Sequence, residues 1–230
     1  MVLSSTRYVE YLNQCHNIGP PKVIDSDSVS SEQHPQSVDD ISQRIVAAAA
    51  EQFIQDGYEG ASTAAIAKLA KTSKREIYAR FENKEGLFKQ VMAYICGLAP
   101  ESNEPESPTP DSLEHILLQT AQAVLTRFLL EETRGVLVCA IGASPKFPSI
   151  PDLFWREGPG QAAEQLALLF KNEPSLTVKN PKQVARQYLL DCCGPFVLGI
   201  LFDPKSKPTA KQTSAHLNAV TSNLIAEYRN

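Results

Sequence analysis

The sequence predicts an all-α protein, with an N-terminal three-helix head built around a helix-turn-helix and a helical C-terminal domain. Three observations lead to this prediction. Apolar residues recur every three or four positions along much of the 230-residue chain. Two short, capped segments meet at a tight turn between Ser62 and Lys84, which is the pattern of a helix-turn-helix. A run rich in proline and glutamate, from Pro100 to Pro110, then separates this head from the rest.

The first predicted helix has apolar residues four positions apart, on one face: Ile41, Ile45, Ala49 and Phe53. We expect Gly57 to end this helix, because glycine adopts the left-handed conformation of a helix C-terminus without a steric penalty. Tyr58 then stands where an apolar residue would fold back on the helix.

The two short helices of the motif have clear start signals. Ser62 is a good N-cap for an alanine-rich helix from Thr63 to Ala70. The next helix begins at Ser73, and Ser73 with Glu76 fits the S-x-x-E capping box, in which each side chain accepts a hydrogen bond from the other residue's backbone amide.

The second helix of the motif has two kinds of face. Ile77 and Phe81 are four residues apart and form the face that we expect to be buried. The other faces carry basic and aromatic side chains: Lys74, Arg75, Tyr78 and Arg80. Asn83 is a further cap signal, and it opens a long helix with apolar residues at helical spacing: Leu87, Phe88, Val91, Met92, Ile95 and Leu98.

Charge is distributed unevenly along the chain. The formal net charge is -4, which argues against a general nucleic-acid binder. Between Lys68 and Lys89, however, seven Lys or Arg residues stand against three Glu residues, so the local net charge is +4. Because affinity for DNA follows local neutralisation of phosphates, an acidic body with a basic head favours binding at a specific site.

The stretch from Ile41 to Met92 resembles the N-terminal domain of TetR-type transcriptional regulators, without a gap. The matching residues are Ile45, Ala48, Ala49, Phe53, Gly57, Tyr58, Ile66, Ala67, Ser73, Ile77, Tyr78, Phe81, Lys84, Glu85 and Leu87. Three residues depart from the family pattern: Lys71 replaces the usual turn glycine, Thr72 a frequent valine and Arg75 a common glycine. We therefore expect a strained or altered turn at Lys71.

The resemblance implies particular DNA contacts. In the family, the residues that match Tyr78 and Lys84 hold phosphates, and the start of the second helix, here Ser62 and Thr63, meets the DNA backbone. The positions that approach bases or neighbouring phosphates match Lys74, Arg75, Ala79 and Arg80. Hydroxyls and helix N-termini suit phosphate, while Arg and Lys can bridge guanine O6 and N7. Without the motif, such a basic run would be a solvated helix face.

Composition divides the chain into four parts. Residues 1–37 are polar, Ser-rich and broken by prolines, so we expect a flexible extension. Residues 38–98 form the DNA-binding head, residues 99–110 a Pro/Glu-rich linker, and residues 111–230 a helical effector-binding and dimerisation domain.

Within that last part, the pattern predicts several helices. Asp111 and Glu114 look like the cap of the first, and Pro181 starts a long one at its first position. Leu153 to Phe170 has continuous helical spacing, whereas periodicity alone leaves the apolar run from Gly135 to Ile141 undecided.

The C-terminal half, above all the segment KFPSIPDLFWREGP, looks like the C-terminal domain of the AefR-like branch of the same family. This resemblance implies a homodimer in which the last two long helices of each copy pair, and a repressor that a small-molecule effector releases from a palindromic operator. The helix from Val184 to Leu201 is apolar around most of its surface, which independently favours burial against a partner or within its own domain.

The candidate residues of the effector pocket are apolar or aromatic and favour an effector of the same character: Phe128, Cys139, Phe147, Phe154 and Trp155. For each of them, ordinary core packing is the alternative explanation.

Other classes of protein find less support. Asp191 beside Cys192 and Cys193 is the nearest approach to a catalytic group, and burial explains it better, so we do not expect an enzyme. His115 and His216 are isolated, and no metal or cofactor is expected. The cysteines include no C-x-x-C pair, which favours reduced thiols. No apolar leader and no 18-residue apolar run occurs, so we expect a cytoplasmic protein. The remaining alternative is a helical interaction module that has lost operator binding.

Overall fold

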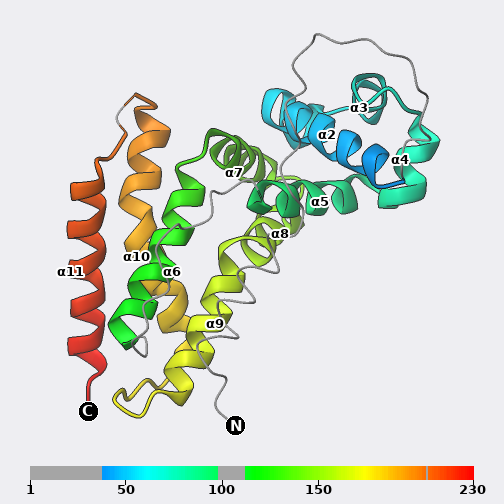
Figure 1. Ribbon diagram of the computed structural model, residues 1–230. Coiled ribbons are helices and arrows are strands. Elements are labelled where there is room, and N and C mark those ends of the chain that lie inside the picture. The colour runs from blue at the N-terminus through cyan, green and yellow to red at the C-terminus, as the bar shows by residue number, and fades with distance from the viewer. Residues whose placement is uncertain (1–37, 98–111, 206) are drawn as a thin grey trace, which may run out of the picture. The chain divides into compact units, whose positions relative to one another are not determined.

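The computed structural model describes residues 38–97, 112–205 and 207–230, and every regular element in these ranges is a helix (Figure 1). The predicted all-α fold class is therefore confirmed. The extension 1–37 and the linker 99–110 fall outside the described residues. The described chain forms two compact units, one with residues 38–97 and Gly135–Phe154, the other with residues 112–134 and Trp155–Asn230.

Four helices make up the predicted head: α2 (Val38–Gly60), α3 (Thr63–Leu69), α4 (Lys74–Phe81) and α5 (Lys84–Gly97). Most of the apolar residues at helical spacing are buried, as expected: Ile45, Ala49, Phe53, Ile66, Ile77, Phe81, Leu87, Phe88, Val91, Met92 and Ile95. Ile41 is only half-buried, and Leu98 falls outside the described residues. Asn83 accepts a 2.8 Å hydrogen bond from the amide of Gly86 and so caps α5. The head therefore folds around the side chains that the periodicity predicts.

The end of α2 is a kink followed by one more turn. Gly57 has φ 70° and ψ 173°, so it takes the positive φ that was expected, but with an extended ψ, and the helix resumes until Gly60. Tyr58 is buried and folds back on the helix, with its ring stacked on Phe53 at 5.7 Å and edge-on to Phe88 at 5.6 Å. Gly57 therefore breaks the helix at the predicted residue, with one further turn after the kink, and the predicted position of Tyr58 is correct.

Residues 135–154 pack in the same unit as the head. The undecided run 135–141 is helical and lies in α7 (Glu131–Ala143), which is followed by α8 (Ser149–Glu157). Phe147 contacts the Tyr58 ring edge-on at 5.1 Å, and Lys146 forms a 2.7 Å ion pair with Glu59. A Cβ atom on Gly135 would lie 2.8 Å from the side chain of Ile54, so glycine allows α7 to approach α2 this closely.

The second unit is a bundle of α6 (Leu113–Phe128), α9 (Pro159–Asn172), α10 (Pro181–Phe202) and α11 (Ala210–Tyr228). α10 is central and packs against the other three helices (Figure 1). A buried 2.8 Å hydrogen bond between the hydroxyls of Tyr188 and Thr221 ties α10 to α11. α10 is also the one described helix with the length and apolar composition of a membrane span, and 33% of that span is buried within the protein.

Helix starts in this unit follow the capping rules, with two differences from expectation. Asn180 caps α10 with Pro181 at the first position, as predicted. The cap of α6 is Ser112, which accepts a hydrogen bond from the amide of His115; Asp111 of the expected cap pair falls outside the described residues. The segment expected as one helix from Leu153 to Phe170 is interrupted at Gly158, so α8 and α9 are separate.

The three cysteines whose side chains are described are free and buried: Cys139, Cys192 and Cys193. Burial raises the pKa of Cys139 to about 11 and the pKa values of Cys192 and Cys193 to about 12. At neutral pH these thiols stay protonated and unreactive, because the thiolate is the nucleophile. They are core residues, as the sequence indicates.

The turn between α3 and α4 contains the strained residue that the sequence predicts. Lys71 has φ 51°, in the left-handed region that a residue with a Cβ atom enters at a cost. The backbone is held there by hydrogen bonds from Lys71 to the carbonyl of Lys68 and from Thr72 to that of Ala67. The turn therefore keeps the geometry of a glycine turn with a lysine in it.

We expect Lys71→Gly to stabilise the head by up to about 1 kcal/mol, because glycine removes this strain and loses part of the gain to its greater freedom in the unfolded chain. Lys68→Gly is the matched control, since Lys68 is helical and the same change there should destabilise by about 1 kcal/mol. Native-state hydrogen exchange of the head amides measures both. Equal destabilisation by the two variants would contradict the strain.

Candidate DNA-binding interface

The orientation of α4 follows from its cap and its buried face. The Ser73 hydroxyl accepts a 3.1 Å hydrogen bond from the amide of Glu76, which fixes the start of the helix. Ile77 and Phe81 are buried in the head. The remaining faces of α4 therefore turn outward, and the exposed residues on them are Lys74, Arg75, Tyr78 and Ala79. Tyr78 keeps 47% of its surface exposed.

The N-terminus of α3 lies beside this exposed face of α4. The Tyr78 hydroxyl is 3.3 Å from that of Thr63, so one hydrogen bond joins the two helices on the outside of the head. Ser62 caps α3 by accepting a 3.2 Å hydrogen bond from the amide of Ala64. We call this continuous set the recognition surface: Ser62, Thr63, Lys74, Arg75, Tyr78 and Ala79.

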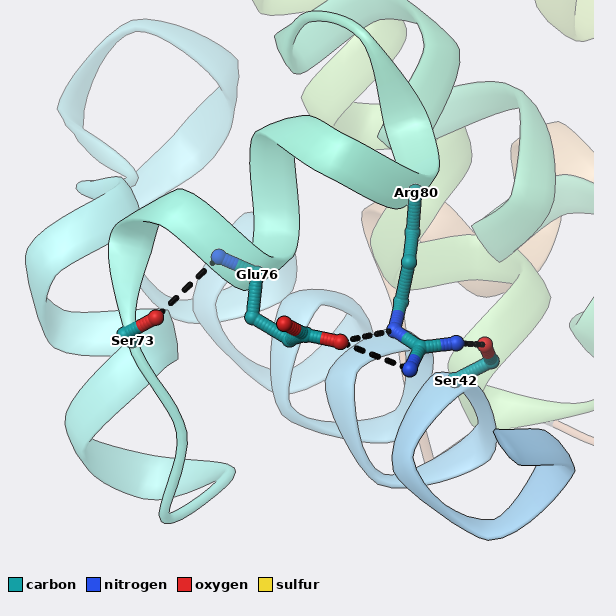
Figure 2. Close-up of polar contacts among 4 residues, drawn as sticks. All are labelled: Ser42, Ser73, Glu76 and Arg80. Atoms are coloured by element: carbon teal, nitrogen blue, oxygen red, sulfur yellow. Dashed lines mark hydrogen bonds and ion pairs between the residues drawn. The ribbon is translucent and has the colours of Figure 1, made fainter. Parts of the chain in front are cut away.

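Only half of the predicted capping box forms. The Ser73 hydroxyl accepts a hydrogen bond from the Glu76 amide, which is the first half of the box. The Glu76 carboxylate, however, accepts hydrogen bonds from Arg80, one turn further along the helix (Figure 2). Arg80 donates from Nε and Nη2 to Glu76 Oε1, at 2.9 and 2.7 Å. Its Nη1 donates to the Ser42 hydroxyl on α2 at 3.1 Å. The side chain of Arg80 is only 17% exposed, so the structure places it against α2 and apart from the recognition surface.

Lys84 lies at the start of α5, next to the turn that follows α2. Its Nζ donates to the carbonyl of Glu59 at 3.2 Å and lies 5.0 Å from the centre of the Tyr58 ring. Burial lowers the pKa of Lys84, and the nearby Cys139 and Glu59 oppose that shift. The ammonium group is therefore held by the head itself, and it must extend away from these partners to reach a phosphate.

The five candidate pocket residues are divided between the two units. Cys139, Phe147 and Phe154 belong to the unit of the head, where Phe147 packs on Tyr58. Phe128 and Trp155 belong to the other unit. There, the Trp155 ring lies under the Arg186 guanidinium at 4.6 Å and close to Gly160, whose absent Cβ atom leaves room for the indole nitrogen.

Two features of the site were missed by sequence reasoning. Glu76 and Arg80 have i,i+4 spacing with the acid on the N-terminal side, which is typical of an ion pair. Because Glu76 also fits the capping box, this pair was not predicted from the sequence. The contacts of Tyr58 and Glu59 with residues 146 and 147 join segments almost ninety positions apart, and periodicity carries no such information.

The recognition surface combines exposed cations with hydroxyl groups next to a helix start. Lys68 in the last turn of α3 and Lys71 in the turn that follows are both exposed, whereas the acidic Glu76 is paired. Such a surface suits a polyanion, because hydroxyls and amides can bind phosphate oxygens while the exposed face of a short helix enters the major groove.

Comparisons with known proteins agree with this geometry. Residues 45–91 match the family described as bacterial regulatory proteins, tetR family, and residues 115–230 match the AefR-like transcriptional repressor, C-terminal domain. A search of curated proteins gives no match.

Solved structures of several regulators share the fold. The flavonoid-responsive regulator FrrA is 23% identical, covers 82% of this chain and 97% of its own, and has a TM-score of 0.67. A regulator assigned to the TetR family from Mesorhizobium loti is 20% identical over 83% of this chain and 97% of its own, with a TM-score of 0.62. One from Pseudomonas syringae pv. tomato is 19% identical over 84% and 99%, with a TM-score of 0.64.

The C-terminal match alone spans half of the chain, and the N-terminal match falls on the helices that carry the recognition surface. The chain therefore belongs to the TetR family of bacterial transcriptional regulators, with a DNA-binding helix-turn-helix head and an AefR-like C-terminal domain.

Proposed function

We propose that this regulator is a repressor that binds a palindromic operator as a homodimer in the cytoplasm and leaves it when a small-molecule effector binds. The observation that carries the proposal is the recognition surface. Burial of Ile77 and Phe81 turns Lys74, Arg75 and Tyr78 outward on one short helix. This is how a recognition helix is presented to the major groove.

Each residue of the recognition surface has a role that suits its chemistry. Lys74 and Arg75 lie in the first turn of α4 and can reach guanine O6 and N7, while exposed Ala79 can meet a thymine methyl group. Tyr78 and Thr63, already joined by their hydroxyls, bind phosphate, and Ser62 does so next to the start of α3.

Lys84 supplies a further phosphate contact in this proposal. Its present partners are a backbone carbonyl and an aromatic ring, neither of which carries a formal charge. A phosphate oxygen offers the ammonium group a full negative charge in exchange. Extension of the side chain from Glu59 to the duplex is therefore favourable.

We expect Lys84→Ala to weaken binding about tenfold on every duplex and to lower the slope of log affinity against log salt by about one. The probe is a duplex that the wild-type protein selects from a randomised pool, compared with a scrambled duplex by fluorescence anisotropy. Lys171→Ala removes an exposed lysine on α9, outside the head; it is the control and should change neither quantity.

If the Lys84→Ala variant kept the wild-type salt slope, this would contradict the phosphate contact of Lys84 but not the proposed function. Failure of the wild-type protein to enrich any duplex would contradict the proposed function and favour an interaction module that has lost operator binding.

The proposed homodimer uses the outer faces of α10 and α11. Exposed apolar residues recur along α10 at Leu190, Leu198 and Phe202, and Phe202 keeps 88% of its surface exposed. The outer face of α11 has small residues that allow close approach of another helix: Ala215, Ala219, Ser222 and Ala226. Pairing with a second copy would bury an apolar stripe that a monomer leaves in water.

Leu198→Glu is expected to convert the dimer to a monomer, because it would place two carboxylates in an apolar interface. Leu168→Glu is the matched control, since Leu168 is an equally exposed leucine on α9. Sedimentation velocity measures both variants and the wild type. A dimeric Leu198→Glu variant, or a monomeric wild type, would show that this face is not the interface.

For the effector, we propose an apolar or aromatic molecule near Phe128 and Trp155 in the C-terminal unit. Packing within the head unit explains the positions of Cys139, Phe147 and Phe154, so we leave these three out of the proposed pocket. Trp155 is the single tryptophan, and its fluorescence would report a ligand directly. FrrA is flavonoid-responsive, which makes flavonoids a first set of compounds to test.

A further inference from the structure

Glu76 is the one acidic residue of the recognition helix, and it lies in the first turn of α4 between the exposed Arg75 and Tyr78. A carboxylate there stabilises the helix, because it faces the positive end of the helix dipole. The same charge is unfavourable next to a duplex. Its side chain is 40% exposed, so burial does not shield the carboxylate from an approaching phosphate.

Arg80 meets Glu76 in a geometry that suits charge neutralisation. Two of its nitrogens, Nε and Nη2, converge on one carboxylate oxygen (Figure 2). The acid precedes the base by four residues, which is the favourable order for an ion pair on a helix. The third nitrogen bonds Ser42 on α2, so the guanidinium also joins the recognition helix to the first helix of the head.

We propose that Arg80 acts in DNA binding through Glu76 and does not contact the duplex: it neutralises the one carboxylate of the recognition helix and anchors that carboxylate toward α2. Arg80 is thus a positioning residue for the recognition surface. This inference rests on the proposed operator binding, and it replaces the direct base or phosphate contact that the family resemblance implies for Arg80.

Charge repulsion between Glu76 and the duplex sets the expected size of the effect. Without Arg80, the Glu76 carboxylate would carry a full negative charge within a Debye length of the DNA phosphates. Repulsion between two unit charges about 4–5 Å apart, in a medium close to water, corresponds to about threefold to tenfold weaker binding. The penalty disappears if the carboxylate disappears with its partner, whereas a lost phosphate contact would not be restored in that way.

The test compares Arg80→Gln with the double variant Glu76→Gln and Arg80→Gln. Glutamine keeps a long polar side chain at position 80, and in the double variant two amides can still bond each other. Binding to the selected duplex is measured over a range of salt concentrations, and hydrogen exchange of the head amides verifies folding. Ser42→Ala, which removes the hydrogen bond between Arg80 and the Ser42 hydroxyl but no charge, is the matched control for the anchor.

We expect Arg80→Gln to bind threefold to tenfold more weakly, and the double variant to return to within about twofold of the wild type with the wild-type salt slope. Ser42→Ala should leave the slope unchanged. A double variant as weak as Arg80→Gln, with a slope lower by about 0.9, would overturn the inference in favour of a direct phosphate contact.

If Arg80→Gln alone does not fold, the double variant decides the matter by the same two readouts. If the wild-type protein selects no duplex, the proposed function fails, and this inference with it. If the wild type binds and the double variant is not rescued, only the inference fails.

Discussion

Burial of Ile77 and Phe81 is the constraint on which the DNA-binding site depends. Two apolar side chains four residues apart fix the rotation of α4 about its axis, because both must enter the core of the head. Lys74, Arg75 and Tyr78 then lie on the exposed faces of the helix. The Ser73 cap sets where the helix starts. The position of these three side chains along the helix axis is therefore fixed, as well as their direction around it.

The head is larger than its helix-turn-helix, and Tyr58 shows why. Its ring packs between side chains of α2 and α5 and meets Phe147 from the segment between α7 and α8. Burial, with help from the charge of Glu85, raises the pKa of Tyr58 to about 12, so its hydroxyl stays neutral. The same ring lies under Lys84, the proposed phosphate ligand. Phe147 therefore contacts the same tyrosine ring that Lys84 contacts.

Much of the head could be predicted from sequence, because its determinants are local. Three features depend only on residues within one or two turns: the caps at Ser62 and Ser73, the packing of Tyr58 back onto α2, and the strain at Lys71. The partner of Glu76 could not be predicted, since a capping box and an i,i+4 ion pair compete for one carboxylate and differ little in energy. The packing of Phe147 on Tyr58 joins distant segments, which local patterns do not encode.

The central claim is that two copies of the outward face of α4 enter the major groove of one duplex. Hydroxyl-radical footprinting on a duplex selected by the wild-type protein tests it most directly. Two recognition helices related by a two-fold axis lie about 34–36 Å apart and protect two patches about one helical turn, or a whole number of turns, apart. We expect these two patches, with dyad symmetry. One asymmetric patch, or uniform protection that does not depend on sequence, would contradict it.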